Sequence, residues 1–414
     1  MTSNMTPADS FIKSLIHAAL GAVDPYEAIR RHVQRQGDTL FVDDARYDLH
    51  GKDVRLIAVG KAAVPMAIAL CELLDNQLLR GVVVTKYHHT PSEHQLPIPV
   101  TEAAHPMPDE NSMQAGDQIC DELTGCTENT LVIACVSGGA SALMIAPHAG
   151  ISINIMRVIN DALLSSGADI RQMNAVRSRL DRLKGGGLVR MASPAQVIGL
   201  ILSDVIGDPL DVIASGITYD ARANNFLVGN NTQACEAVAN IARTMGCEPH
   251  IITTELCGEA RHQGQRIAQE LFSFANSNEF GVTQVLIYGG ETTVTIRGTG
   301  RGGRNQELAL AAAIKLDLMV GADDPREMYI VAIGTDGTDG PTDAAGAIAR
   351  SDTVRRARQL LMDAQAYLNR NDSYPFFQKL GDLIRTNPTG TNVADIVIAI
   401  VGPNVARRGC ELTH

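Results

Sequence analysis

The sequence predicts an α/β protein with two domains, and three observations support this. The chain has 414 residues, more than one average domain holds. Short apolar, β-branched runs alternate with helical patterns along nearly its whole length. Many of these runs are apolar at every position, which is typical of a parallel sheet covered on both faces. We expect a larger N-terminal Rossmann-like parallel sheet with helices on both faces in residues 1–245, and a smaller C-terminal α/β domain in residues 246–414.

The elements of the first domain follow in order. The strands expected are residues 54–59, 81–86, 131–136 and 196–203. The helices expected are residues 9–33, a segment from 61 onward, 110–124, about 151–165 and about 168–184, the last ended by three glycines. The segment NNFLVGNN is polar and indicates turns before the next domain.

The second domain repeats the alternation. Its expected strands are residues 250–256, 282–290, 292–298, 328–334 and 395–402. One expected helix follows the first of these strands and ends at about residue 276, and another covers residues 304–316.

Composition excludes several classes of function. The net charge of −11 argues against nucleic acid as a partner, because phosphate backbones need clustered Lys and Arg. Eight scattered cysteines without C-x-x-C pairs, and an N-terminus without a signal-peptide pattern, indicate a cytoplasmic protein with reduced thiols. Residues 131–156 carry no formal charge, but Ser137-Gly138-Gly139 interrupts them, so we expect no membrane span.

Ligands of parallel α/β sheets bind beyond the carboxyl ends of the strands, which directs attention to the loops there. Lys61 follows one strand and opens a helix, where a lysine beside helix N-terminal amides suits phosphate. In VSGGASAL, Gly138 and Gly139 allow close backbone approach and Ser141 offers a hydroxyl. A solvated lysine and a tight turn capped by serine are the structural alternatives.

One helical face gathers further polar groups. Asn174, Arg177, Asp181 and Lys184 are spaced so that they share this face, although a solvated face with internal ion pairs is the commoner outcome. In LSDVIGD, Asp204 and Asp208 trail a strand, where they could take a proton, hold a metal or cap a turn.

A glycine-rich segment, RGTGRGGRNQE, formally satisfies the dinucleotide fingerprint G-x-G-x-x-G. The acid expected about 20 residues later would fall on Asp323 or Asp324, in a loop instead of at a strand end. Arg301 and Arg304 beside the glycines favour the binding of several phosphates instead.

The stretch GTDGTDGPTDAAGA follows the expected strand 328–334. Mg²⁺ needs only one or two carboxylates, with waters and phosphate oxygens completing its shell. We expect Asp336, and next Asp339, to hold Mg²⁺, and we expect Asp343 to cap an Ala-rich helix. Carboxylates, glycine amides, a lysine and arginines together are the groups that phosphoryl transfer requires.

In this combination the chain resembles the class II glycerate 2-kinases, formerly named hydroxypyruvate reductases. The matching segments cover nearly the whole chain in order: VGKAA, AAHPMPDENS, VSGGASAL, NAVRSRLDRLKGGGL, LSDVIGDPLDVIASG, YGGETTV, GRGGRNQELAL, GTDGTDGPTDAAGA and NPTGTNVADIVIAIVG. One departure is Ile217, where the family usually has proline, but this removes no charged group.

The resemblance implies ATP- and Mg²⁺-dependent phosphorylation of D-glycerate at the 2-hydroxyl, with the active site in a cleft between two α/β domains. It implies Lys61, Arg304 and Asp204 as catalytic residues. The candidates for binding substrate or phosphate are Ser137, Gly138, Gly139, Ser141, Asn174, Arg177, Lys184, Gly302, Gly303 and Glu291. The expected partners are D-glycerate and ATP, and the sequence leaves a homodimer open. The alternatives are an NAD(P)H-dependent hydroxypyruvate reductase, motivated by the glycine fingerprint, and a non-enzymatic sensor that kept the fold.

Overall fold

The computed structural model describes residues 6–402 except 91–95, 169, 278–280, 322–323 and 325. The chain divides into two compact units, each considered by itself below. The parallel-sheet unit comprises Val23–Asn230 and Gly390–Val393, and the mixed-sheet unit comprises Met1–Ala22, Asn231–Thr389 and Ala394–His414. This division differs from the predicted boundary at residue 245, because the first helix and the helix after residue 230 both pack in the mixed-sheet unit.

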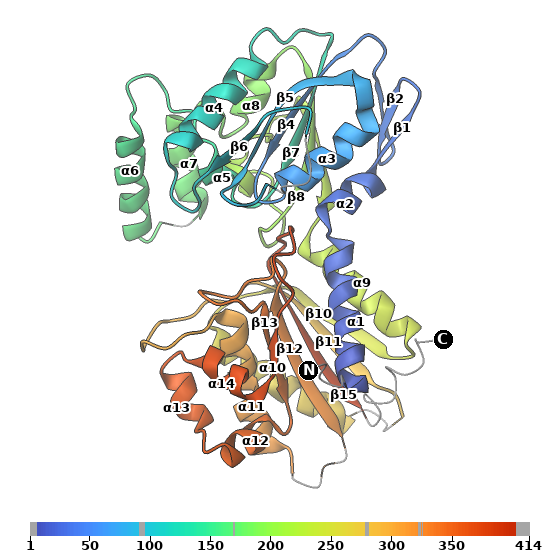
Figure 1. Cartoon of the computed structure of the whole chain (residues 1–414), viewed down its shortest axis with the longest axis vertical. Coiled ribbons are helices and arrows are strands. Elements are labelled where there is room, and N and C mark those ends of the chain that lie inside the picture. Colours follow the sequence, from blue (N-terminus) through green and yellow to red (C-terminus); the bar gives the residue numbers. More distant parts are fainter. Residues whose placement is uncertain are drawn as a thin grey trace. The chain divides into compact units, whose positions relative to one another are not determined.

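The parallel-sheet unit contains a six-stranded sheet in the order β6-β5-β4-β7-β8-β9, in which every neighbouring pair is parallel (Figure 1). Its strands are β4 (Asp53–Val59), β5 (Leu78–Lys86), β6 (Val100–Ala103), β7 (Thr130–Val136), β8 (Gln196–Leu202) and β9 (Ala223–Gly229). A separate antiparallel sheet holds β1 (Val33–Gln36), β2 (Thr39–Val42) and β3 (Ala45–Asp48). The predicted parallel sheet is confirmed.

Helices cover both faces of the six-stranded sheet. The helices of this unit are α2 (Pro25–His32), α3 (Ala63–Leu74), α4 (Glu110–Leu123), α5 (Ala140–Leu143), α6 (Ile153–Ser165), α7 (Ile170–Leu180) and α8 (Gly187–Ala192), with 3₁₀ turns at Asp75–Gln77 and Ile213–Ser215. Alternate strand residues such as Ile57 and Val132 pack with α4 and α8, while Leu56 and Ile133 are buried on the opposite face. Burial on both faces explains why the central strands β7 and β8 are apolar at every position after their first residue.

The mixed-sheet unit contains a second six-stranded sheet, in the order β10-β11-β15-β12-β13-β14. Its strands are β10 (Glu248–Leu256), β11 (Gln284–Gly290), β12 (Glu327–Gly334), β13 (Gly346–Arg350), β14 (Leu383–Ile384) and β15 (Asp395–Gly402). Only the β10–β11 pair is parallel, and β15 runs antiparallel between β11 and β12. The carboxyl ends of β11 and β12 therefore meet the amino end of β15 at one edge.

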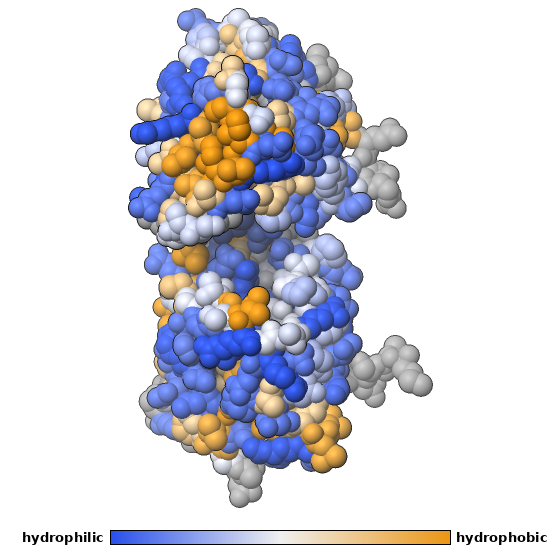
Figure 2. Space-filling view, turned by 90° about the vertical axis from the view of Figure 1, so that its left-hand side faces the viewer, coloured by the Kyte–Doolittle hydropathy of each residue, from blue (hydrophilic) through white to orange (hydrophobic). Residues whose placement is uncertain are grey.

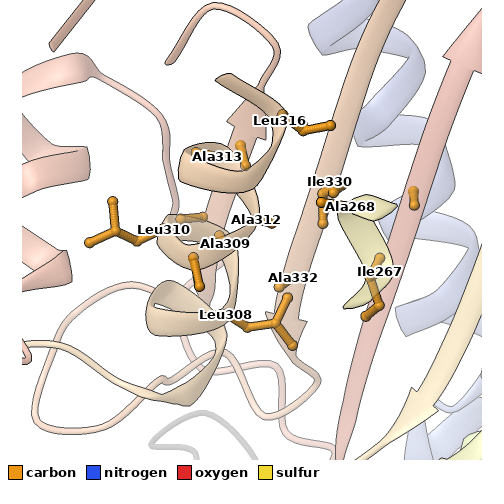
Figure 3. Packing of buried hydrophobic residues seen from close by; sticks show 14 of the residues in the cluster. Ile267, Ala268, Leu308, Ala309, Leu310, Ala312, Ala313, Leu316, Ile330 and Ala332 are labelled. Atoms are coloured by element: carbon orange, nitrogen blue, oxygen red, sulfur yellow. The ribbon is translucent and has the colours of Figure 1, made fainter. Parts of the chain in front are cut away.

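Helices pack on this sheet as well. They are α1 (Pro7–Ala22), α9 (Asn231–Thr244), α10 (Ala260–Ser277), α11 (Arg304–Met319), α12 (Thr353–Gln359), α13 (Ala364–Asn369) and α14 (Ser373–Leu380). Figure 3 shows Ala309, Ala312 and Ala313 of α11 in one buried cluster with residues of α10 and β12. The missing side chain of Gly264 on α10 lets the backbone of α11 approach closely, because a Cβ at this position would collide with the carbonyl of Leu308.

Four expectations about single elements are wrong. The expected helix 9–33 is two helices, because Pro25 follows Asp24, whose side chain caps α2 by accepting from Glu27 N at 2.9 Å. Residues 292–298 form a single bridge instead of a strand, and NNFLVGNN forms most of edge strand β9 instead of turns. The Ala-rich residues after Asp343 form β13, so Asp343 caps no helix and instead accepts from the Tyr374 hydroxyl at 2.6 Å.

No helix among the described residues is long and apolar enough to cross a membrane. Figure 2 shows apolar side chains gathered on one face of the parallel-sheet unit, where α6 faces the viewer; Ile155 and Val158 of this helix are exposed.

Candidate functional site

In the parallel-sheet unit, three predicted residues meet at the carboxyl edge of adjacent strands. Lys61 follows β4, Gly138 follows β7 and Asp204 follows β8. The Lys61 amide donates to the Gly138 carbonyl at 2.9 Å, and the Ala62 amide donates to the Ser137 hydroxyl at 3.1 Å. These bonds lock the loop after β4 onto the loop after β7, so the backbone fixes where the Lys61 side chain begins.

Glycine is required at two positions of this turn. A Cβ on Gly138 would collide with the Asp204 carboxylate, so the absence of a side chain lets that acid approach the backbone. Gly139 has φ 87°, and a Cβ there would lie 3.0 Å from the His105 ring and 3.5 Å from Lys61 Cγ. The turn therefore brings a carboxylate, an ammonium-bearing side chain and an imidazole around the same two glycines.

Two further residues of this edge lie outside the sequence predictions. Asn392 Nδ2 donates to Asp204 Oδ2 at 3.1 Å and so orients the carboxylate. His105 follows the short strand β6; burial, and next the charge of Lys61, lower the pKa of its ring to about 4, so the imidazole is neutral at neutral pH. Sequence analysis missed His105 because it did not recognise β6, although AAHPMPDENS was among the matching segments.

The predicted polar face is only partly helical, because α7 ends at Leu180: Asn174 and Arg177 lie on the helix, whereas Asp181 and Lys184 follow it. Ser141 Oγ lies 2.8 Å from Ser215 Oγ, which donates to Asn174 Oδ1 at 3.1 Å. Lys184 Nζ donates to the Ser141 carbonyl at 3.0 Å and lies 3.7 Å from Asp181 Oδ2. Asn174 and Lys184 are thus buried and hold the loop after β7 in place. Arg177 instead lines a cavity together with Gly139, Ser141 and His105.

In the mixed-sheet unit, Arg304 is the centre of an ion-pair network. Its Nε and Nη2 donate to Asp395 at 2.5 and 2.9 Å, and its Nη1 lies 2.5 Å from Glu291 Oε1. Burial lowers the pKa of Arg304, but the bidentate bond to Asp395 outweighs it and raises that pKa. Burial raises the pKa of Asp395 to about 6 against the opposing effect of Arg304.

The sequence rule for strand carboxyl ends does not indicate Asp395, because this residue lies at the amino end of a strand. It begins β15, whose antiparallel direction pairs it with Gly290 of β11 and Gly334 of β12. The amino end of one strand therefore joins the carboxyl ends of two others. Only the strand order reveals this.

The two aspartates expected to hold metal occupy different environments. Asp336 is half-buried, and its Oδ1 accepts from the amide and hydroxyl of Thr338, each at 2.9 Å. Asp339 is 2% exposed, and its oxygens accept from the amides of Asn305 at 3.1 Å and Gln306 at 2.8 Å. Asp339 therefore caps the start of α11, and burial raises its pKa to about 7. No group of three or more metal-ligating residues occurs within the described ranges.

The glycine-rich segment before α11 is packed against protein. Side chains added to Gly298 or Gly300 would collide with Arg370, and one on Gly302 would collide with Ser373. A Cβ on Gly303 would strike the Asp339 carboxylate. These glycines thus let residues 370–373 and Asp339 approach the loop, and a dinucleotide has no comparable access to them.

Both halves of the chain match known protein families, and relatives of similar length align with most of it. Residues 11–243 match the model "Domain of unknown function (DUF4147)", and residues 284–395 match the MOFRL family. The glycerate 2-kinase of Pyrococcus horikoshii is 38% identical, with 94% of this chain and 96% of that protein covered. The D-glycerate 2-kinase of Thermotoga maritima is 38% identical, with 84% and 90% covered. The solved Thermotoga maritima glycerate kinase structure aligns with a TM-score of 0.84 at 35% identity, covering 94% of this chain and 98% of that one.

Proposed function

Because this chain belongs to the glycerate 2-kinase family, we propose that it transfers the γ-phosphoryl group of ATP to the 2-hydroxyl of D-glycerate, giving 2-phospho-D-glycerate and ADP. The observation that carries this proposal is the convergence of Lys61, the Gly138-Gly139 turn and Asp204 at one edge of the parallel sheet. Family membership alone would not assign these roles, since fold and function are separable.

In the parallel-sheet unit, Asp204 accepts the proton of the 2-hydroxyl as the hydroxyl oxygen attacks the γ-phosphorus. The bond from that phosphorus to the β–γ bridging oxygen breaks, and ADP leaves with the electron pair. Lys61 stabilises the negative charge on the transferred group. The Ser137 amide already donates to the Val59 carbonyl at 3.0 Å, so the amides of Gly138 and Gly139 and the hydroxyls of Ser137 and Ser141 support the binding of phosphate or the glycerate carboxylate.

In the mixed-sheet unit, Arg304 supplies a second positive charge for the transferred phosphoryl group, held in place by Asp395 and Glu291. Gly302 and Gly303 position the start of α11 beneath it. Of the two predicted metal ligands, Asp336 fits Mg²⁺ because its half-buried carboxylate lies in a loop, whereas the oxygens of Asp339 already cap α11. Bound with ATP, Mg²⁺ would neutralise phosphate charge.

The decisive experiment incubates the purified protein with D-glycerate, ATP and Mg²⁺ and identifies the product by ³¹P NMR. We expect ADP and 2-phosphoglycerate in equal amounts. A 3-phosphoglycerate product would overturn the assigned acceptor atom, and a lack of ADP formation would overturn the kinase proposal.

The second candidate is a hydroxypyruvate reductase, the name carried by two relatives from Agrobacterium vitis. The packed glycines before α11 argue against it, because the dinucleotide fingerprint needs glycines open to a pyrophosphate. NADH oxidation with hydroxypyruvate, in the absence of ATP, would favour the reductase. A cytoplasmic location, a homodimer and a site in an interdomain cleft stay predictions.

A further inference from the structure

The cavity beside the Gly139 turn lies entirely within the parallel-sheet unit and has a volume of about 210 Å³. At about 30 Å³ for each water-sized group, this volume holds about seven such groups. Two helices, α6 and α7, form one side, and the loop after β6 forms another. Arg157 of α6 donates to the Pro108 carbonyl at 3.2 and 3.1 Å and so ties the helix to that loop. The cavity is therefore large enough for a small organic acid.

The charges facing this cavity are unbalanced. Among the described residues, its lining contains Arg177 and Lys184 but no acidic side chain. Asp181 lies 3.7 Å from Lys184 and compensates that charge. Arg177 donates to the side-chain amide of Asn160, and no ion pair to Arg177 occurs within the described residues. Burial lowers the pKa of Arg177, as expected for a half-buried cation without a carboxylate partner.

Such a cation calls for an anionic ligand. A half-buried guanidinium without a counter-ion is costly, and a carboxylate can satisfy two of its N–H groups at once. Arg177 also contributes to lowering the pKa of Lys184, after the larger effect of burial. An anion bound between them would relieve this repulsion.

Much of the remaining lining is hydrocarbon. The apolar wall consists of Ile145, Met156, Ile159, Leu163 and Leu180. A wholly polar ligand would make no apolar contact with the side chains of this wall. The neutral His105 ring and Ser141 lie toward the Gly139 turn, where a hydroxyl of the ligand could be bound.

We propose that this cavity binds small 2-hydroxy carboxylates, with the carboxylate on Arg177 and a short aliphatic substituent against the apolar wall. The proposal rests on the proposed function, because it places the acceptor acid beside the Gly139 turn. It deepens that function by giving the ligand class: acids with a methyl or ethyl group at the position of the glycerate hydroxymethyl bind as well as D-glycerate does.

The test measures binding by calorimetry without ATP, so that turnover is not needed. The probes are D-glycerate, (R)-lactate, (R)-2-hydroxybutyrate and, as an uncharged analogue, lactamide. We expect the three acids to bind with Kd values within about threefold of one another and lactamide to bind at least tenfold more weakly. R177Q should weaken binding of every acid at least tenfold, whereas R179Q, which changes an exposed arginine of the same helix, should not.

A second variant reports on the apolar wall. A142L places a larger side chain in the cavity, which reduces the space for the ligand, and should weaken the binding of 2-hydroxybutyrate more than the binding of D-glycerate. Equal binding of acids by R177Q and the unmodified protein, or of lactamide and lactate, would overturn the proposal. A protein that binds acids through Arg177 yet forms no ADP would refute the kinase function only. An R177Q variant that forms 2-phosphoglycerate with unchanged KM would refute the cavity assignment only.

Discussion

Substitution of Asp395 by asparagine tests whether Arg304 must be held by a carboxylate. Asp395 accepts two hydrogen bonds from the Arg304 guanidinium, at 2.5 and 2.9 Å, while asparagine offers one oxygen and turns an N–H₂ group toward the cation. Hydrogen bonds to charged groups contribute about 1.5–3 kcal/mol each. If the hydrogen bond that D395N removes normally positions Arg304 in the transition state, kcat should fall about 10- to 100-fold, since each 1.4 kcal/mol of activation free energy changes the rate about tenfold.

The pH profile separates positioning from simple destabilisation. Burial raises the pKa of Asp395 to about 6, so protonation below that pH releases the bidentate bond to Arg304. The kcat of the unmodified protein should therefore fall as pH decreases through about 6, and D395N should lack this acidic limb. Activity is followed by ADP formation with D-glycerate as acceptor, and the KM for D-glycerate should change little.

A matched control exists in the same unit. Asp382 is 4% exposed and forms ion pairs with Arg350, at 3.2 Å, and with Arg356, but not with Arg304. D382N should lower the free energy of unfolding comparably and leave kcat within about twofold. A positioning role for Asp395 is refuted if D395N keeps the kcat and the acidic limb of the unmodified protein, or if D395N and D382N lower kcat equally.

Four further predictions concern the predicted site residues. K61A should lower kcat about 10²- to 10³-fold with an intact fold, and near-normal turnover would remove its assigned role. D204N should lower kcat without raising the KM for ATP; retention of most activity would show that Asp204 is not the base. G138A should lower kcat because the added methyl group collides with Asp204, as steady-state assays on a correctly folded variant would show. Burial raises the pKa of Asp339 to about 7, so the folded state keeps a proton that the unfolded state releases, and stability is lost as pH rises from about 4 to 7. Urea denaturation should show this slope, up to about 1.4 kcal/mol per pH unit, flattened in D339N.

Sequence pattern predicted the strands that are buried on both faces. β7 and β8 are apolar after their first residue and β4 is apolar from Leu56 to Val59, and the rule for carboxyl ends then located Lys61 and Asp204. The same pattern failed at β9, an edge strand with asparagines, where Asn224 bonds the Tyr47 hydroxyl and Asn225 bonds the Thr218 carbonyl. The Asn224 contact joins residues 177 positions apart in the sequence, and local propensity does not reveal such a partner.

Tertiary packing also decided what the acidic and glycine-rich loops do. Asp336 and Asp339 look alike in sequence, yet Asp339 caps α11 because the loop after β12 passes over the start of that helix. Its carboxylate reaches the helix amides only because Gly303 has no side chain. Sequence alone cannot separate a helix cap from a metal ligand when the two segments lie more than 30 residues apart.

The sequence by itself determined the alternation of strands and helices, the glycines of the turn after β7 and the candidate charges at the strand ends. These follow from local periodicity and from backbone demands that each segment carries within itself. Only the tertiary structure decided that Asp395 holds Arg304, because an antiparallel strand brings its amino end to an edge where sequence rules expect carboxyl ends. Only the structure showed that Arg177 faces a cavity and has no ion-pair partner among the described residues, since charge balance depends on which side chains meet in space.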